Sequence, residues 1–208
     1  MPQTFDHLHT GVWSFLDESE EDRITRLYMP KWVSYEGASE ALARMEHLLR
    51  HPPCGRMPSM LLYGDSDIGK TMIVDKFVRD HPNICNQFGE VEARKVLRLQ
   101  MPSKPNDGRL YAQIIDGLGH NAPYTRRGTD LEILALRLLH RNPPRLMIVD
   151  EVHHLLAGSV REQRQSLNQL KFLSNELRMP VVALGTSEAL YAMQADPQIA
   201  SRFEPFAL

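Results

Sequence analysis

The sequence from residue 64 to residue 71 reads Gly64-Asp65-Ser66-Asp67-Ile68-Gly69-Lys70-Thr71, and this stretch indicates the fold. It is a complete G-x-x-x-x-G-K-[ST] pattern, typical of a phosphate-binding loop. Gly64 and Gly69 leave room for backbone N–H groups to turn towards a phosphate. Lys70 brings a positive charge to the β and γ oxygens, and Thr71 offers its hydroxyl to Mg²⁺. The pattern predicts a site for a nucleoside triphosphate with Mg²⁺.

The sequence on either side of this loop fits a strand followed by a helix. Residues 60–63 form a short apolar run that suits a buried strand, and residues 71–78 suit the helix that follows. The alternative is a glycine-rich strand-to-helix turn that holds no ligand. The Lys-Thr pair at the end of the loop favours the nucleotide site over this alternative.

A second apolar run, residues 145–149, ends in the acidic pair Asp150 and Glu151. Such a run is typical of a strand that is buried on both faces of a parallel sheet. In a phosphate-loop protein the first acid holds Mg²⁺, and the second can orient or deprotonate the attacking water. Thr186 ends a later strand-like run, where its hydroxyl could sense the γ-phosphate. Alternatively, Thr186 or Ser187 caps the next helix.

Arg202 is a further candidate because a guanidinium suits the charge that develops on a γ-phosphoryl group. The sequence leaves open whether Arg202 faces the nucleotide of its own chain or that of a neighbouring subunit. The alternative is that Arg202 forms an ordinary ion pair on the surface. The adjacent His153 and His154 follow the acidic pair directly. Adjacent histidines at the start of a loop are more often surface or packing residues, and we expect no catalytic or metal role for them.

The 208 residues contain 42% apolar residues, enough for one core domain. We expect residues 1–36 to be an irregular arm, in which the acidic run at 17–22 is a helix start or a flexible segment. Residues 37–208 would form the core, in which the acidic pair and the loop lie on strands of one parallel sheet. Alternating runs predict strands at 60–63, 95–100, 145–149 and 180–184, and helices at 39–49, 110–118, 131–138, 160–177 and 187–193.

Net charge and cysteine usage exclude several classes of protein. The formal net charge of −2 gives no global basic field, so any nucleic-acid surface must be local. Cys54 and Cys85 are far apart and predict buried thiols rather than a zinc site. No signal peptide and no run of apolar residues long enough to span a membrane are present, which favours a cytoplasmic protein.

Taken together, these features resemble the TniB family, the AAA+ ATPase regulators of transposons that are related to TnsC. The resemblance covers residues from about 25 to 208. The segments that carry it are residues 56–71, 110–111, 146–151, 154–158, 175–177, 185–186 and 196–203. The Leu-Leu-Ala-Gly segment and the Asp-Pro-Gln-x-x-Ser-Arg-Phe segment are far more specific than the phosphate loop.

The resemblance implies a three-layer αβα P-loop NTPase of the AAA+ type, with a parallel sheet of order 5-1-4-3-2. It implies ATP with Mg²⁺ at a subunit boundary and an ATP-dependent ring or filament of identical subunits on double-stranded DNA. Such an assembly would connect a separate DDE-type transposase with a TniQ-like target selector.

The resemblance also implies roles for single residues. Lys70 and Thr71 would bind phosphate and Mg²⁺, Asp150 and Glu151 would be the paired acids, and Arg202 would reach into the next subunit. Aromatic residues between Tyr28 and Tyr35 would lie near the adenine, although simple packing at the domain edge is the alternative. Loops after the second strand would contact DNA phosphates through Lys104, Arg126 and Arg127. The alternative is that these three residues belong to solvated basic loops.

Two departures from the family pattern leave other functions open. Asp67 replaces a neutral residue, often Asn, and its negative charge beside the phosphates could weaken nucleotide binding. The chain stops at residues 206–208, where relatives continue into the last strand and a helical lid, so we expect the lid to be absent. A lid-less nucleotide-binding module without turnover is therefore one alternative. A helicase-loader-like AAA+ protein is another, although residues 196–203 argue against it.

Overall fold

The computed structural model describes residues 10–29, 31–85, 87, 91–103, 107–123, 127–194 and 196–208. The chain divides into two units, residues 1–33 and 34–208, which we treat separately. The first unit contains the 3₁₀-helix η1 (Thr10–Phe15) and the helix α1 (Glu20–Tyr28). The Ser19 side chain accepts a hydrogen bond from the backbone N–H of Asp22, and the last three residues of the acidic run, Glu20, Glu21 and Asp22, lie in the first turn of α1. The expectation of an irregular arm is therefore wrong for these residues, although the acidic run does start a helix.

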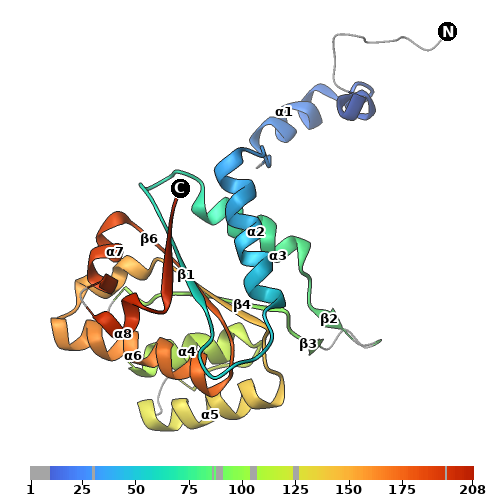
Figure 1. The fold of residues 1–208 in the computed structure, drawn as a ribbon. Helices are drawn as coiled ribbons and strands as arrows, with labels where there is room; N and C mark the ends of the chain where they lie inside the picture. Colours follow the sequence, from blue (N-terminus) through green and yellow to red (C-terminus); the bar gives the residue numbers. More distant parts are fainter. Residues whose placement is uncertain are drawn as a thin grey trace. The chain divides into compact units, whose positions relative to one another are not determined.

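The second unit is built on a sheet of five parallel strands (Figure 1). Their order across the sheet is β4 (Val96–Gln100), β5 (Leu146–Asp150), β6 (Val181–Gly185), β1 (Ser59–Tyr63) and β7 (Phe203–Ala207). Counted along the chain and read from β7, this is the predicted order 5-1-4-3-2. β7 pairs with β1 along its whole length, so the expectation that the chain stops before the last strand is wrong. Pro205 obscures this strand in the sequence, and an edge strand can accommodate a proline.

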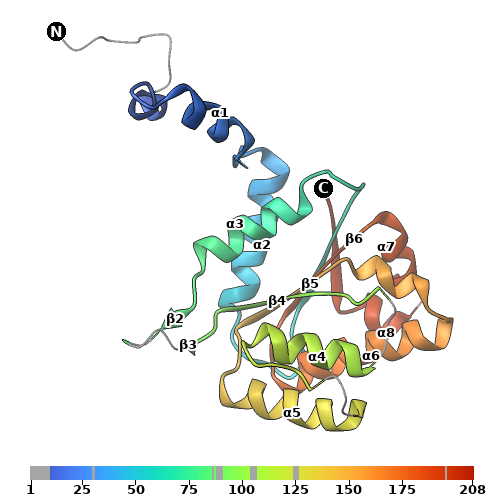
Figure 2. The same ribbon diagram turned by 180° about the vertical axis from the view of Figure 1, so that it is seen from behind.

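Helices cover both faces of this sheet, so the unit has three layers (Figures 1 and 2). The chain crosses the sheet in one direction from β1 to β4 and returns in the other, and right-handed connections place the helices of the two paths on opposite faces. One face carries α2 (Glu36–Arg50) and α3 (Lys70–Asp80). The other carries α4 (Asp107–Gly117), α5 (Gly128–Arg141), η2 (Val152–Ala157), α6 (Val160–Glu176), α7 (Ser187–Gln194) and α8 (Pro197–Ala200). In the described part of the chain, no helix has the length and the apolar character needed to cross a membrane.

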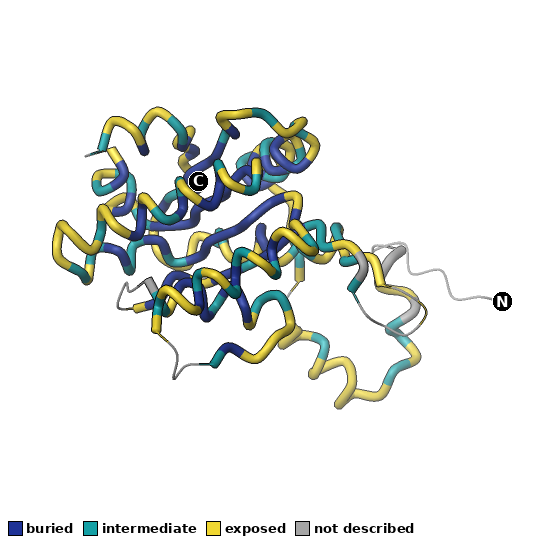
Figure 3. The backbone as a smooth tube through the Cα atoms, turned by 90° about the horizontal axis from the view of Figure 1, so that it is seen from below, coloured by how far each residue is buried: buried dark blue, intermediate teal, exposed yellow. Residues whose placement is uncertain are grey.

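The core follows from the alternation of side chains along the strands. Leu97, Met147 and Val149 belong to a cluster with residues of α4, α5 and α6 on one face of the sheet. Met45 of α2 and Phe77 of α3 are buried on the other side of the sheet. Every residue of β5 and β6 is buried, as expected for central strands that are covered on both faces (Figure 3).

Three local features differ from the sequence prediction. A short antiparallel pair, β2 (Ile84–Cys85) and β3 (Val91–Ala93), was not predicted, because strands of two or three residues leave no periodic pattern. Val160, which fits the apolar pattern of the helix predicted at 160–177, is 63% exposed. Cys85 is exposed and Cys54 is partly exposed, so the expectation of two buried thiols is wrong.

Candidate nucleotide-binding site

The phosphate loop connects β1 to α3 at the carboxyl edge of the sheet. Gly69 precedes α3 with a φ of 101°, a left-handed conformation that glycine adopts readily. Asp67 also has a positive φ, 62°, and aspartate tolerates this region better than most residues. A Cβ atom at Gly64 would lie 3.1 Å from the carbonyl oxygen of Leu208, which follows β7. The backbone of the loop therefore requires small or tolerant residues at these three positions.

Lys70 lies against the loop that precedes it. Its Nζ atom donates hydrogen bonds to the carbonyl oxygens of Gly64, at 3.0 Å, and Asp65, at 2.6 Å. These contacts place the ammonium charge beside the loop at the N-terminus of α3. A helix N-terminus with an adjacent cation is a favourable position for a phosphate group.

Asp150 and Thr71 meet across the end of β5, as the motifs predicted. The Asp150 carboxylate is only 11% exposed, and its Oδ2 atom lies 3.4 Å from the Thr71 hydroxyl. Its Oδ1 atom accepts a hydrogen bond from the backbone N–H of Glu151 at 2.9 Å. One carboxylate and one hydroxyl are thus close enough together to share a cation that prefers oxygen ligands.

Arg98 is a site residue that the sequence analysis missed. It lies in the middle of β4, and its Nη2 atom is 3.2 Å from Asp150 Oδ2. Its Nη1 atom forms an ion pair with Asp75 on α3. The available signal was a lone cation within the otherwise apolar run Val96-Leu-Arg-Leu, because a charged side chain among buried residues generally has a partner.

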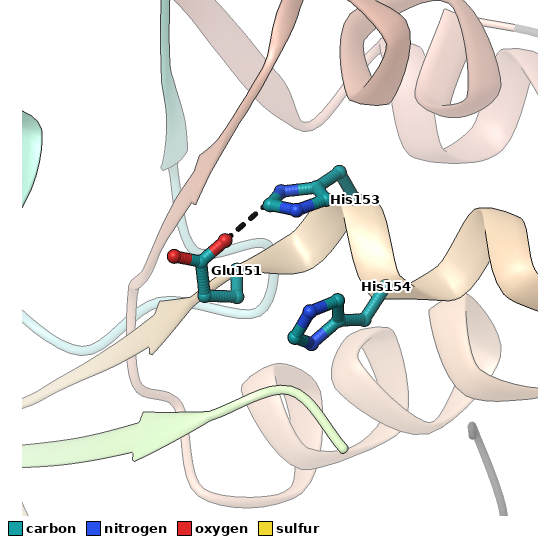
Figure 4. Close-up of side chains that lie close together, drawn as sticks. All are labelled: Glu151, His153 and His154. Carbon is teal, nitrogen blue, oxygen red and sulfur yellow. Dashed lines mark ion pairs between the residues drawn. The ribbon is translucent and has the colours of Figure 1, made fainter. Parts of the chain in front are cut away.

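Glu151 projects from a strained backbone position at the start of η2. Its φ is 58°, a value that non-glycine residues adopt mainly where the surrounding structure imposes it, often at functional sites. Its Oε2 atom lies 3.1 Å from His153 Nδ1 (Figure 4). The Nδ1 atom of His154 lies 2.9 Å from the carbonyl oxygen of Met101. Both histidines are half-buried beside Glu151, a placement that the sequence did not predict.

Thr186 follows β6 and contributes a hydroxyl that has no hydrogen-bond partner. Its Oγ1 atom is buried, and no group of the described residues bonds to it, so Thr186 does not cap α7 through its side chain. The chain approaches closely here, because a Cβ at Gly185 would lie 2.7 Å from the Cβ of Ala189. The Thr186 hydroxyl is therefore available to bond to a group bound in the cleft.

These residues line one cleft of about 590 Å³, a volume in the usual range for small-molecule sites. Tyr35 lies beside the loop, with its hydroxyl 3.9 Å from where a Cβ of Gly69 would be. The lysine, the acid–hydroxyl pair and the free Thr186 hydroxyl fit a nucleotide with Mg²⁺. The cleft is lined by Ser66, Asp67, Gly69, Lys70, Thr71, Met72, Gln100, Asp150, Glu151, His153, His154, Leu184, Gly185 and Thr186.

Arg202 lies at the opposite, amino edge of the sheet. Its carbonyl oxygen accepts a hydrogen bond from the N–H of Ser59, the first residue of β1, whereas the loop follows the last residue. Five residues of strand separate the two edges by about 16 Å. Its Nη1 atom donates a 2.6 Å hydrogen bond to Asn175 Oδ1, and the residue borders a hollow of about 910 Å³ outside the cleft. Arg202 therefore does not face the nucleotide site of its own chain.

The three predicted DNA contacts are placed only in part. Lys104 and Arg126 lie outside the described residues. Arg127 is exposed and precedes α5 as its N-cap residue, without a capping hydrogen bond from its side chain. An exposed cation at a helix start is compatible with a phosphate contact or with solvation, so this role stays a prediction.

The sequence matches the model of the family described as "Bacterial TniB protein" over residues 23–208. The chain belongs to the TniB family. Among curated proteins, none matches this TniB chain.

Solved structures show that the TniB chain has the fold of AAA+ ATPases. The Aeropyrum pernix ORC1 protein in complex with DNA has a TM-score of 0.63 at 16% identity, over 86% of the TniB chain and 46% of its own. The Drosophila ORC bound to DNA has a TM-score of 0.58 at 18% identity, over 100% and 50% of the two chains. The Aeropyrum pernix ORC2 protein, in ADPNP-ADP complexes, has a TM-score of 0.59 at 18% identity, over 86% and 48%. The TniB chain thus spans about half the length of these structures.

Proposed function

We propose that this TniB chain is an ATPase that assembles on double-stranded DNA with ATP and links a DDE-type transposase to a TniQ-like target selector. The observation that carries the proposal is the single cleft in which Lys70, the Thr71–Asp150 pair, Glu151 and Thr186 meet. Membership of the TniB family supports the regulation of transposition. Similar folds in complexes with ADPNP and ADP, and with DNA, support the nucleotide and the DNA as ligands.

In this proposal the loop and α3 bind the phosphates. The backbone N–H groups after Gly64, the dipole of α3 and the Lys70 ammonium would all face the phosphate oxygens. Lys70 would exchange its two carbonyl contacts for those oxygens. Thr71 and Asp150 would hold Mg²⁺, which neutralises charge on the β and γ oxygens when it is bound.

Glu151 and Thr186 would take part in the hydrolysis of ATP. The Glu151 carboxylate can accept a proton from the attacking water, once it turns away from His153. The unpartnered Thr186 hydroxyl can donate a hydrogen bond to the γ-phosphate or to the water. Neither residue is needed to hold the remaining phosphates, so their loss should affect turnover more than binding.

Arg202 would complete the site of a neighbouring subunit. Its position at the amino edge, on a hollow that is separate from the cleft of its own chain, supports a contact between subunits. A guanidinium there would meet γ-phosphate charge that exists only in the ATP state. Assembly would then be strengthened by ATP and weakened after hydrolysis.

A titration with a fluorescent ATP analogue tests the nucleotide site. Lys70→Ala should weaken binding about tenfold to a hundredfold, because a hydrogen bond to a charged group contributes about 1.5–3 kcal/mol. Lys76→Ala is a matched control, because Lys76 lies on the same helix and pairs with Asp80. Unchanged affinity in Lys70→Ala would overturn the nucleotide-site assignment.

Electron microscopy with an ATP analogue and duplex DNA tests the assembly. We expect rings or filaments on DNA with the analogue and their loss with ADP. If the chain binds the analogue but stays monomeric on DNA, a nucleotide-binding module without assembly or turnover replaces the proposal.

A further inference from the structure

Three neighbouring side chains that line the cleft carry nitrogen or oxygen atoms able to bind a metal ion. Glu151, His153 and His154 each offer one potential ligand atom, and these atoms all lie within 4.8 Å of one another. Figure 4 shows the Glu151 side chain at the end of β5, with the imidazole rings of His153 and His154 extending from η2 towards it. All three residues are half-buried. The cluster is distinct from the Thr71–Asp150 pair, because among the described residues no hydrogen bond or ion pair joins its side chains to the side chains of Thr71 or Asp150.

The hydrogen bond of His154 fixes which of its nitrogens is free. A carbonyl oxygen only accepts, so Nδ1 carries the proton that is donated to Met101. The lone pair is then on Nε2. Met101 is itself held in place, since its N–H donates to the carbonyl oxygen of Asp150 at 2.8 Å. Histidines that bind metals generally donate their other N–H to such a carbonyl or to a carboxylate.

The buried Nδ1 atom of His153 is a second potential ligand atom. Its Nδ1 atom is shielded from solvent and, among the described residues, makes no aligned hydrogen bond, although Glu151 Oε2 is 3.1 Å away. Two histidines and a glutamate form a common ligand set of catalytic zinc sites. With bonds of about 2.0–2.1 Å, ligand atoms around a tetrahedral ion lie roughly 3.3 Å apart. The Glu151–His153 distance of 3.1 Å already matches this spacing. The 4.8 Å limit on the other separations exceeds it by about 1.5 Å at most, which side-chain rotation would have to close.

We propose that Glu151, His153 and His154 form a binding site for a divalent transition metal of the zinc class. Mg²⁺ is a poor occupant, because it prefers oxygen ligands in an octahedral arrangement, whereas imidazole favours zinc, cobalt, nickel and copper. The site leaves at least one coordination position open to water or to an oxygen of a ligand in the cleft. It therefore differs in chemistry from the Mg²⁺ position at Thr71 and Asp150.

Occupancy of this site has a consequence that rests on the proposed function. A coordinated Glu151 carboxylate cannot accept the proton of the attacking water. Lys70 and Thr71 are not ligands of the metal, so nucleotide binding continues. The metal thus holds the protein in its ATP state, and this TniB chain becomes an ATPase that transition metals inhibit without displacing ATP.

Titration with Co²⁺ tests the site directly, because the visible absorption of Co²⁺ reports nitrogen coordination. ATP is omitted, since it chelates the metal. His47 and His51 are first changed to alanine, because His47 in the last turn of α2 and the C-cap residue His51 have ring centroids 6.1 Å apart and could bind metal themselves. In this background we expect one Co²⁺ per chain, displaced by Zn²⁺. His153→Ala/His154→Ala should weaken binding at least tenfold.

The matched control is His140→Ala, which removes another histidine that faces a glutamate, Glu176, at a distance of 3.4 Å. This change should leave Co²⁺ binding unchanged. Circular dichroism and binding of the fluorescent ATP analogue check that the variants are folded. Equal Co²⁺ affinity in the folded double variant and its parent would overturn the site.

Zn²⁺ inhibition tests the consequence separately. Hydrolysis with excess Mg²⁺ should fall over the same range of free Zn²⁺ that displaces Co²⁺, and the affinity for the ATP analogue should not change. Zn²⁺ binding without inhibition would refute the effect on Glu151. A chain without any turnover would contradict the proposed ATPase activity instead, and the Co²⁺ titration would still decide the metal site.

Discussion

Arg98 pairs with the carboxylate of Asp150, the residue that the motifs assign to Mg²⁺ binding. Its guanidinium lies 3.2 Å from Asp150 Oδ2, the atom that the Thr71 hydroxyl also approaches. A fixed positive charge at this distance opposes the arrival of a divalent cation. Arg98→Ala should therefore tighten Mg²⁺ binding to the complex with the ATP analogue by a few fold, because the partly exposed pair is screened. Weaker Mg²⁺ binding in a Mg²⁺ titration would instead show that Arg98 positions the carboxylate.

Glu151 combines a strained backbone with a carboxylate in the cleft. Glu151→Gln keeps the shape of the side chain and the same φ, so the melting temperature should not change. The amide cannot accept a proton, so we expect hydrolysis to slow by about 10²–10⁴-fold while the ATP analogue still binds. Single-turnover kinetics measure both effects. A variant that hydrolyses ATP at the wild-type rate would show that Glu151 is not the base.

Asp67 adopts a left-handed backbone conformation in the phosphate loop, and its carboxylate adds a negative charge beside the phosphates. Its φ of 62° suits Asp or Asn, whereas most other residues lose about 1 kcal/mol or more there. Asp67→Asn should keep the stability and tighten binding of the ATP analogue by a few fold, since it removes a negative charge. Asp67→Ala also removes the charge but should lower the free energy of unfolding by about 1 kcal/mol. Equal affinity in Asp67→Asn and wild type would show that the charge does not reach the phosphates.

At the scale of elements, α6 depends on its capping box. Ser159 accepts a hydrogen bond from the N–H of Glu162, and the Glu162 carboxylate accepts one from the N–H of Ser159. The S-x-x-E pattern of residues 159–162 is typical of such a box. Ser159→Ala should lower the melting temperature by about 2–4 °C. Thr129→Ala, an exposed change in the first turn of α5, serves as the control.

The capping box also makes the stability of the folded state depend on pH. Hydrogen bonds from the side chain and the backbone N–H of Ser159 lower the pKa of Glu162. A lowered pKa stabilises the folded state above the ordinary pKa of the carboxyl, and this contribution is lost as the pH falls through the lowered value. The difference in melting temperature between wild type and Ser159→Ala should therefore shrink in acid. A constant difference across that range would show that the carboxylate does not contribute.

At the scale of the whole molecule, the placement of Arg202 at the amino edge makes the proposed ATPase depend on assembly. A mixture of Arg202→Ala and Glu151→Gln can form sites in which one chain supplies Glu151 and its neighbour supplies Arg202. We expect such mixtures to recover part of the ATPase activity that each variant lacks, and wild-type activity to rise with protein concentration. Mixtures as inactive as their components, beside an active wild type, would show that Arg202 does not act between subunits.

The sequence by itself determined the features that depend on neighbouring residues. The loop at 64–71, the apolar strands β5 and β6 and the capping box at Ser159 are local patterns, since backbone conformation and burial on both faces impose their residue types. The pairing of Thr71 with Asp150 was also predictable, because a phosphate loop and an acid at the end of a neighbouring strand meet at one edge of the sheet.

Only the tertiary structure decided the other contacts between distant side chains of the site. Arg98 reaches Asp150 because β4 pairs with β5 in register, and no local pattern encodes that neighbour. His153 and His154 face the cleft because the left-handed backbone of Glu151 turns the chain into η2. Arg202 lies far from its own cleft because β7 runs parallel to β1, so the start of β7 lies at the opposite edge from the loop. Strand order and register are collective properties of the packed sheet, and short stretches of sequence leave them open.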